Sequence, residues 1–269
     1  AADPAVDFSR YDNDGDGLQC YVNSVQFRNY KMRDAELEAL GGPDANGIPT
    51  VSGQWDFNNQ LTFEDSLRAT LGADMGLLPD TEFSTTFFSL PIRDTDANVL
   101  QYAAGANTDG YVVVPGNPGN GGGERINQYT LVMDVMFPAT TINSWHSLWQ
   151  TRTNNTDDAS LFLRPASSGG GVGISGSYHG TIAGDTWYRL AFSFDLATRT
   201  LKKYIDGHLV GQQTLGEGVD GRWSAGPTAL LFADNDGDSA PGNCNSVQFH
   251  PRVLSDAEIA LLGTASAAS

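Results

Sequence analysis

The sequence predicts an all-β fold, with two antiparallel sheets packed as a sandwich and one short helix near the C-terminus. Short segments of alternating apolar and polar residues recur along the chain, with turn residues about every ten positions. The chain has 269 residues, of which 31 are glycine, and long helical patterns are few. Sandwiches commonly run past about 200 residues as one domain, so this length suits a single large sandwich.

Alternation locates the individual strands. In the segment WYRLAFSFD, Leu190, Phe192 and Phe194 share one face and are expected in the core. Asp206 and Gly207 are the signal of a type I′ turn, which predicts a hairpin between the segments on either side. Further strands are expected at 51–58, 99–103, 111–115, 129–138, 147–151, 160–164, 171–177 and 228–233, and loop at 61–78.

One stretch of the sequence occurs twice, with the same internal spacing. The motifs DNDGD, NSVQF and a DAE-containing segment ending in Leu-Gly lie at 12–16, 23–27 and 33–41, and again at 234–238, 245–249 and 255–263. Such a repeat predicts one complete unit preceded by the tail of another. The expected organisation is therefore a partial repeat at 1–42, a complete sandwich at 43–263 and a short tail at 264–269.

The second NSVQF motif reads as a half-buried strand. Val247 and Phe249 lie on one face, and Ser246, Gln248 and His250 lie on the other. The first face is expected in the core and the second at the surface.

A short helix is expected after this strand. Ser255 and Glu258 have the spacing of a capping box, and Gly263 stands where helices commonly end. These signals predict a helix from Asp256 to Leu262.

The segment that ends in the predicted hairpin also resembles a known family. A Trp opens an alternating strand, an Asp closes it, and the next strand ends in Tyr-x-Asp-Gly, here Trp187, Asp195, Tyr204, Asp206 and Gly207. This pattern resembles the laminin-G-like, concanavalin A-like jelly roll, over roughly residues 47–263. The resemblance implies a two-sheet jelly-roll sandwich, and it leaves the function open because lectins, adhesion modules, pentraxins and glycoside hydrolases share it.

The repeated DNDGD loops are the candidate metal sites. Alternating carboxylates bring several hard oxygen atoms toward one cation, which suits calcium. The alternative is a solvated loop in which Asp and Asn side chains satisfy backbone groups. The candidate ligands are Asp12, Asp14, Asp16, Asp234, Asp236 and Asp238.

Aromatic residues in loops are the candidate glycan-binding residues. Aromatic rings pack against the CH faces of sugars, and neighbouring polar groups bind their hydroxyls. The candidates are Trp145, Tyr178, His179 and Trp223, with a place in the core as the alternative, whereas Trp149 is expected in the core.

The two cysteines, Cys20 and Cys244, lie in the two copies of the repeat. They would form a disulfide if the copies lay side by side, and two separate thiols are the alternative.

No catalytic residues are predicted. The hydrolases of this sandwich class carry Glu-x-Asp-x-x-Glu on a strand, and the sequence has no such run. Asp134 and Asp195 are the carboxylates nearest to such a pattern, and both are interpreted as structural. No phosphate-binding loop or dinucleotide motif is present.

The formal net charge of −17 argues against nucleic acid and anionic membranes as partners. No apolar run approaches the roughly 18 residues that a membrane-spanning helix needs. The chain starts Ala-Ala-Asp-Pro without a signal peptide, as a mature form would, and its low Lys and Cys content favours a secreted or cell-surface bacterial protein.

These observations predict a non-catalytic recognition or adhesion module that binds an extracellular polysaccharide or a cell-surface glycan, with calcium ordering its loops. One alternative is a structural repeat that self-associates by adding the duplicated N-terminal segment to a sheet edge. Another is a glycan-active enzyme of the same sandwich class with a noncanonical site.

Overall fold

The computed structural model describes residues 53–57, 67–78, 88–103, 110–115, 119–153, 161–234 and 237–267, together with Val25. The chain divides into two compact units, Ala1–Pro49 and Thr50–Ser269, and the fold described below is that of the second unit. Except for Val25, the partial repeat at 1–42 lies outside the described residues. The candidates Asp12, Asp14, Asp16 and Cys20 lie outside them as well.

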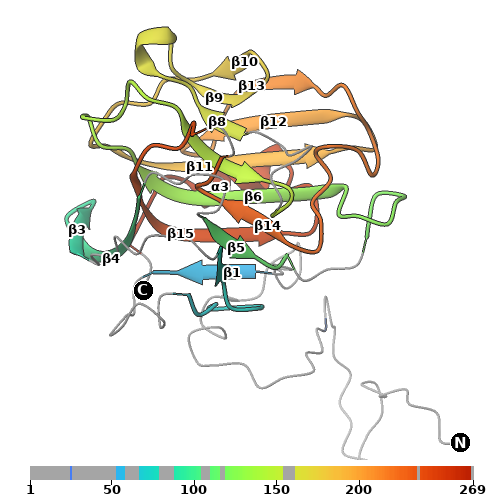
Figure 1. The fold of residues 1–269 in the computed structure, drawn as a ribbon, viewed down its shortest axis with the longest axis horizontal. Helices are drawn as coiled ribbons and strands as arrows, with labels where there is room; N and C mark the ends of the chain where they lie inside the picture. Colours follow the sequence, from blue (N-terminus) through green and yellow to red (C-terminus); the bar gives the residue numbers. More distant parts are fainter. Residues whose placement is uncertain are drawn as a thin grey trace, which may run out of the picture. The chain divides into compact units, whose positions relative to one another are not determined.

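Two antiparallel sheets form the second unit, as the sequence predicts (Figure 1). Sheet A has the order β13-β12-β11-β6-β15-β4-β3, with β1 also paired to β15, and sheet B has the order β10-β9-β8-β7-β14-β5-β2. The strands of sheet A are β1 (Gly53–Asp56), β3 (Phe88–Ile92), β4 (Thr95–Tyr102), β6 (Gln128–Met136), β11 (Trp187–Asp195), β12 (Thr200–Ile205), β13 (His208–Thr214) and β15 (Gly242–His250). Those of sheet B are β2 (Gly76–Leu77), β5 (Tyr111–Val113), β7 (His146–Gln150), β8 (Leu161–Leu163), β9 (Val172–Ile174), β10 (Ser177–His179) and β14 (Ala229–Leu231).

The core lies where the apolar faces of the strands meet. Phe194 on β11 and Phe249 on β15 stack on either side of Tyr129, with ring centroids 4.6 and 5.3 Å away. The hydroxyl of Tyr129 is buried and donates to the carbonyl oxygen of Trp223 at 2.8 Å. The predicted core face of β11 is confirmed, because Leu190, Phe192 and Phe194 are all fully buried. The opposite face is not left exposed, since Ala191 and Ser193 are buried as well.

The predicted hairpin between β12 and β13 is also confirmed. Asp206 and Gly207 both have positive φ angles, 51° and 79°, as a type I′ turn requires.

The short helix α3 (Asp256–Leu262) has the predicted bounds and the predicted capping box. The Ser255 hydroxyl accepts from the Glu258 amide, and the Glu258 carboxylate accepts from the Ser255 amide. Ile259 packs with apolar residues of sheet A, so α3 covers part of the outer face of this sheet. The other members of this cluster are Val132, Ala191, Tyr204, Leu254 and Leu262.

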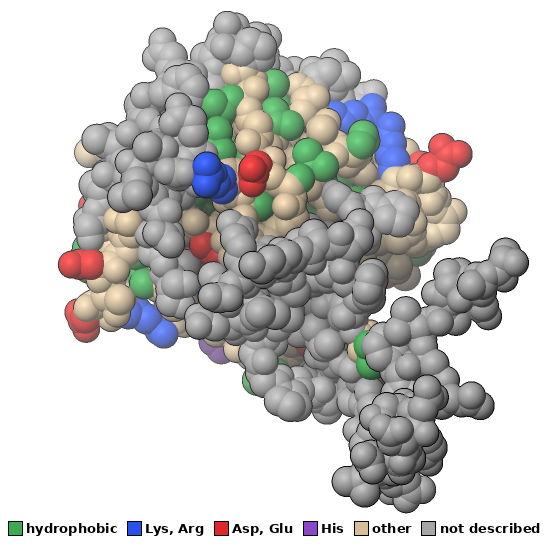
Figure 2. Space-filling model, turned by 90° about the horizontal axis from the view of Figure 1, so that it is seen from below, with side chains coloured by type: hydrophobic (Ala, Val, Ile, Leu, Met, Phe, Trp, Pro, Cys, Tyr) green, Lys and Arg blue, Asp and Glu red, His purple; other side chains and the backbone are tan. Residues whose placement is uncertain are grey.

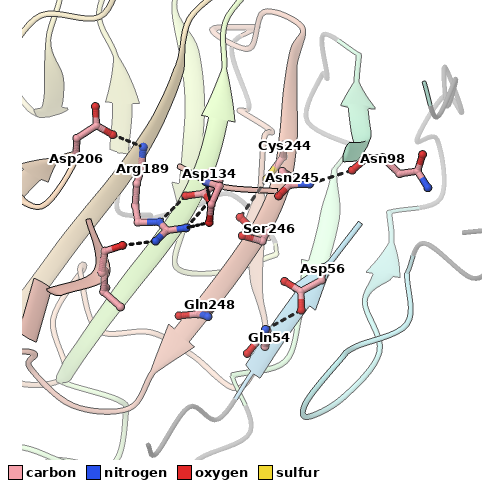
Figure 3. A network of polar contacts seen from close by, with 12 residues as sticks. Gln54, Asp56, Asn98, Asp134, Arg189, Asp206, Cys244, Asn245, Ser246 and Gln248 are labelled. Carbon is pink, nitrogen blue, oxygen red and sulfur yellow. Dashed lines mark hydrogen bonds and ion pairs between the residues drawn. The ribbon is translucent and has the colours of Figure 1, made fainter. Parts of the chain in front are cut away.

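A buried ion pair lies beside α3 on the same face of sheet A (Figure 3). Arg189 on β11 donates to both carboxylate oxygens of Asp134 on β6, at 2.7 and 2.6 Å. Its guanidinium also donates to the carbonyl oxygen of Leu262 at the end of α3, and the Ser266 amide donates to Asp134 at 3.2 Å. The pair thus fastens the end of the helix and the residues after it to the sheet.

The repeated NSVQF segment forms residues 245–249 of β15. It lies between β6 on one side and β1 on the other, and β4 pairs with the preceding residues, 242–244. Val247 and Phe249 are buried as predicted, and Ser246 and Gln248 are only half-buried. His250 was expected at the surface, and this expectation is wrong because its side chain is only 6% exposed. Two charged residues act on its imidazole: Arg252, two positions later in the chain, and Glu258, in α3.

Cys244 on β15 is fully buried, and it has no disulfide partner among the described residues. Its predicted partner Cys20 lies outside the described residues, so the disulfide stays a prediction.

Charged and apolar side chains are scattered over the described part of the face drawn in Figure 2. The Asp and Glu side chains there stand singly or in small groups, so the acidic charge is not gathered in one patch of that described surface. Within the described ranges, no helix has the length and apolar character needed to cross a membrane.

Candidate functional site

Trp145 lies directly before β7, where two loops from distant parts of the chain meet. Its carbonyl oxygen accepts from the Ala240 amide at 2.9 Å, which ties it to the loop after β14. The Thr141 hydroxyl donates to the Pro241 carbonyl oxygen at 3.3 Å, and His146 Nε2 lies 3.0 Å from the Thr141 carbonyl oxygen. These contacts hold the backbone on both sides of Trp145.

The strand register of sheet B places two further aromatic residues near Trp145. Tyr178 on β10 lies opposite Gly173 on β9, which lies opposite Phe162 on β8. Residues directly opposite one another project from the same face of a sheet. The Trp145 ring contacts both side chains, with centroids 5.7 Å from Phe162 and 5.5 Å from Tyr178.

The three rings differ in burial. Phe162 is 8% exposed and forms the buried base of the cluster, whereas Trp145 and Tyr178 are half-buried and keep part of their ring surface in solvent. We call Trp145, Phe162 and Tyr178, with the charged residues Arg164 and Asp238 described next, the aromatic site.

Two charged groups border the rings. The guanidinium carbon of Arg164 lies 5.0 Å from the centroid of the Tyr178 ring, within the range of a cation–π contact. Asp238, in the second DNDGD loop, is half-buried and interacts electrostatically with the Tyr178 hydroxyl. Burial raises the pKa of Tyr178, so this hydroxyl is protonated at neutral pH and can donate a hydrogen bond.

The loop that carries Arg164 is held by several backbone contacts. The Arg164 amide donates to the Gly171 carbonyl oxygen at 2.9 Å, and its Nε donates to Gly170 at 3.0 Å. A short 3₁₀ helix, η1 (Ala166–Ser168), follows, and its Ser167 amide donates to the Asn143 side chain at 2.9 Å. The Arg164 loop is therefore fastened to the loop that leads to Trp145.

His179 does not belong to this site. It alternates with Tyr178 on β10, and its Nδ1 lies 3.2 Å from the Nζ of Lys203. Lys203 is fully buried and also donates to the Gln213 side chain at 2.7 Å and to the Ser177 carbonyl oxygen. Burial lowers the pKa of Lys203 to about 8. This contact joins β10, at the edge of sheet B, to β12 and β13 of sheet A, and we interpret it as structural.

Trp223 also lies away from the aromatic site. It is 7% exposed, belongs to the main core and supplies the carbonyl group that Tyr129 binds. Arg222 lies above its ring, with 5.9 Å between the guanidinium carbon and the ring centroid.

The second DNDGD loop borders the aromatic site through Ala240 and Asp238. Asp234 is 3% exposed and accepts from the Gln150 side chain at 2.9 Å, whereas Asp236 lies outside the described residues. Within the ranges that the structure describes, no group of three or more His, Cys, Asp or Glu side chains is placed to hold a metal ion. Calcium binding at this loop stays a prediction. The structure does bring together two candidates that the sequence leaves separate, the acidic loop and Trp145.

Sequence reasoning missed Phe162 and Arg164. Both lie in the apolar segment SLFLR, for which the sequence predicts only a strand. The two-residue spacing of Phe162 and Arg164 indicates that they lie on the same face of a strand. It does not indicate that Tyr178, which lies on a different strand, is next to them.

The two carboxylates interpreted as structural have protein partners. Asp134 binds Arg189, and Asp195 accepts from Gln128 at 3.0 Å and from Thr198 at 2.8 Å.

The two antiparallel sheets form a sandwich of the jelly-roll type. Residues 132–260 match a laminin G-type family model, described as the Concanavalin A-like lectin/glucanases superfamily. The match confirms the resemblance to the laminin-G-like, concanavalin A-like jelly roll. No curated protein sequence matches the chain.

Several solved structures share this fold. Domain 4 of AbnA, an extracellular arabinanase from Geobacillus stearothermophilus, in complex with arabinotriose, is 16% identical with a TM-score of 0.52, over 80% of this chain and 98% of that domain. The ligand-binding domain of botulinum neurotoxin serotype D with N-acetylneuraminic acid is 11% identical with a TM-score of 0.51, over 79% of this chain and 50% of that one. A Trypanosoma rangeli sialidase with 2,3-difluorosialic acid is 14% identical with a TM-score of 0.53, over 80% of this chain and 33% of that one.

At these identities the likeness concerns the fold alone. The chain spans about half the length of the neurotoxin structures and about a third of the sialidase.

Proposed function

We propose that this chain is a non-catalytic module that binds glycans at the aromatic site. The observation that carries the proposal is the meeting of Trp145 and Tyr178, whose rings come from separate segments and lie 5.5 Å apart with part of each in solvent. Arg164 and Asp238 supply charged groups beside them. Apolar ring surface bordered by a few polar groups is what sugar binding requires.

The fixed geometry of the site supports the same function. Tyr178 and Phe162 lie on paired strands, and backbone hydrogen bonds hold the loops of Trp145 and Arg164. A site that is ordered before binding loses less conformational entropy when the ligand arrives.

The comparisons support a glycan as the ligand. The AbnA domain is in complex with arabinotriose, and the neurotoxin domain is in complex with N-acetylneuraminic acid. A secreted or cell-surface location, where a polysaccharide or glycan is accessible, is part of the proposal, as is an adhesive role.

A glycan array tests the proposal with the whole chain and three variants. Trp145→Ala and Tyr178→Ala should weaken binding at least about tenfold, a loss of about 1.4 kcal/mol, because each removes half of the ring pair. Leu209→Ala is the control, since Leu209 is 48% exposed on β13 and should leave binding unchanged. Failure of the wild type to bind any glycan, or equal binding by Trp145→Ala, would overturn the proposal.

A second candidate function is assembly through the duplicated segment, and one observation favours it. Val25 in the first NSVQF copy is 53% exposed, whereas its counterpart Val247 in the second copy is 1% exposed. We propose that Val25 fills a place on the sheet edge of another unit that corresponds to the place of Val247 in the complete unit.

Sedimentation velocity tests this second candidate. If the segment drives assembly, the mass of the whole chain rises with concentration and Val25→Asp abolishes the rise. A constant monomer mass for the wild type would refute it.

A further inference from the structure

Arg164 is a cation of the aromatic site that has no carboxylate partner among the described residues. Within the described part of the chain, ion pairs join Arg189 to Asp134, Lys202 to Asp256 and Arg252 to Glu258, and none involves Arg164. Its Nε donates to Gly170, and a guanidinium has five N–H donors in total. Donors on its outer nitrogens are therefore available to a ligand.

The position of Arg164 places these donors beside the rings. Its guanidinium carbon lies 5.0 Å from the Tyr178 ring centroid, and Arg164 lies two residues after Phe162. A sugar ring packed on Trp145 and Tyr178 would therefore have a cation at one edge. The bonded loop from Arg164 to Gly171 holds the base of this side chain in place.

The charge of the chain makes this cation distinctive. The chain has 32 Asp and Glu residues against 15 Lys and Arg, so its net charge repels an anion. Asp238 is also near Tyr178, but Arg164 lowers the pKa of the Tyr178 hydroxyl by more than Asp238 raises it. Arg164 is thus the stronger of the two charges acting on the Tyr178 hydroxyl.

We infer that the aromatic site prefers a glycan that carries a carboxylate, such as a sialic acid or a uronic acid, and that Arg164 determines this preference. A guanidinium binds a carboxylate through two parallel hydrogen bonds, a geometry that Lys does not reproduce. This inference rests on the proposed glycan binding at the same rings, and it adds the class of sugar.

Calorimetric titration of the whole chain with matched ligand pairs tests the inference. Sialyllactose is compared with lactose, and trigalacturonate with its methyl ester, so that the two sources of carboxylate are distinguished. In the wild type, the acidic member of at least one pair should bind at least about tenfold more tightly, equal to about 1.4 kcal/mol. Arg164→Gln should abolish this difference, and Arg164→Lys should retain only part of it. Thermal unfolding of each variant checks that the fold is intact.

The outcomes separate this inference from the proposed function. Equal binding of acidic and neutral members, still lost in Trp145→Ala, would overturn the inference and leave glycan binding in place. A preference for the acidic member that survives Arg164→Gln would overturn the role of Arg164. Absence of binding to every glycan, neutral or acidic, would overturn both.

Discussion

Arg189 and Arg164 show how differently one residue type is used in two regions of this molecule. Arg189, on the outer face of sheet A, donates to both oxygens of the buried Asp134 and to the end of helix α3 (Figure 3). Arg164, beside the rings at the edge of sheet B, has no carboxylate partner among the described residues. A cation whose donors the protein satisfies holds the fold, whereas a cation with open donors beside half-buried rings is available to a ligand.

The largest expected effect comes from breaking the first of these arrangements. Arg189→Met leaves the carboxylate of Asp134 buried without a counter-ion, and removing one partner of such a pair typically costs about 3–5 kcal/mol. Urea unfolding at neutral pH should show this loss in the free energy of unfolding. The matched double variant Asp134→Leu with Arg189→Met should recover most of it. A loss below about 1 kcal/mol for Arg189→Met would contradict the assigned role.

The two tryptophans predicted as glycan ligands give a second contrast. Trp223 is 7% exposed in the main core, so Trp223→Ala should lower the free energy of unfolding by about 3–5 kcal/mol. Trp145 is half-buried, so Trp145→Ala should cost clearly less stability and mainly reduce glycan binding. Denaturant unfolding and glycan titration of both variants measure these effects. Equal losses of stability in Trp145→Ala and Trp223→Ala would contradict the assignment of Trp223 to the core and Trp145 to the site.

The second DNDGD loop, beside Trp145, is expected to make the stability of the chain depend on calcium. The sequence predicts that the second DNDGD loop binds calcium, which at a hundredfold excess over its dissociation constant adds about 2.7 kcal/mol. The expected result is a higher melting temperature in calcium than in chelator, with the difference reduced in Asp236→Ala and Asp238→Ala. Identical melting curves for the wild type in calcium and in chelator would contradict calcium binding. The loop would then serve only as a connection between sheet B and Trp145.

A smaller effect should appear with pH on the sheet A side. Burial lowers the pKa of His250 to about 4, and Arg252 adds to this shift. Between about pH 6.5, the ordinary His value, and pH 4, the unfolded chain binds a proton at this residue that the folded chain does not. The contribution of His250 is therefore present above about pH 6.5 and is lost as the pH falls toward 4. Urea unfolding of the wild type and of His250→Gln at pH 7 and pH 4.5 measures this contribution. The free energy of unfolding should fall less between the two pH values in the variant than in the wild type. An equal fall in both proteins would contradict the assignment to His250.

Local signals in the sequence were sufficient for much of the fold. The alternation at Leu190, Phe192 and Phe194 located β11, the Asp206-Gly207 pair located the hairpin, and Ser255 with Glu258 located the start of α3. Each of these signals acts within a few residues. The burial of His250 is different, because its own strand pattern predicts an exposed side chain.

The site was predictable only in part. Trp145 and Tyr178 were named as separate aromatic residues, but their meeting depends on the register of sheet B and on the bond between Ala240 and Trp145. The sequence does not point to Phe162 and Arg164, because it predicts only a strand at 160–164. Trp223 was expected in a loop, but it lies in the main core, and its carbonyl oxygen accepts a hydrogen bond from the distant Tyr129.

A crystal structure of the whole chain with its tightest-binding glycan would test the central claim most directly. The account predicts a sugar ring packed against Trp145 and Tyr178, with a carboxylate within hydrogen-bond distance of the Arg164 guanidinium. A glycan bound elsewhere, with Trp145 and Tyr178 free of it, would contradict the assignment of the aromatic site.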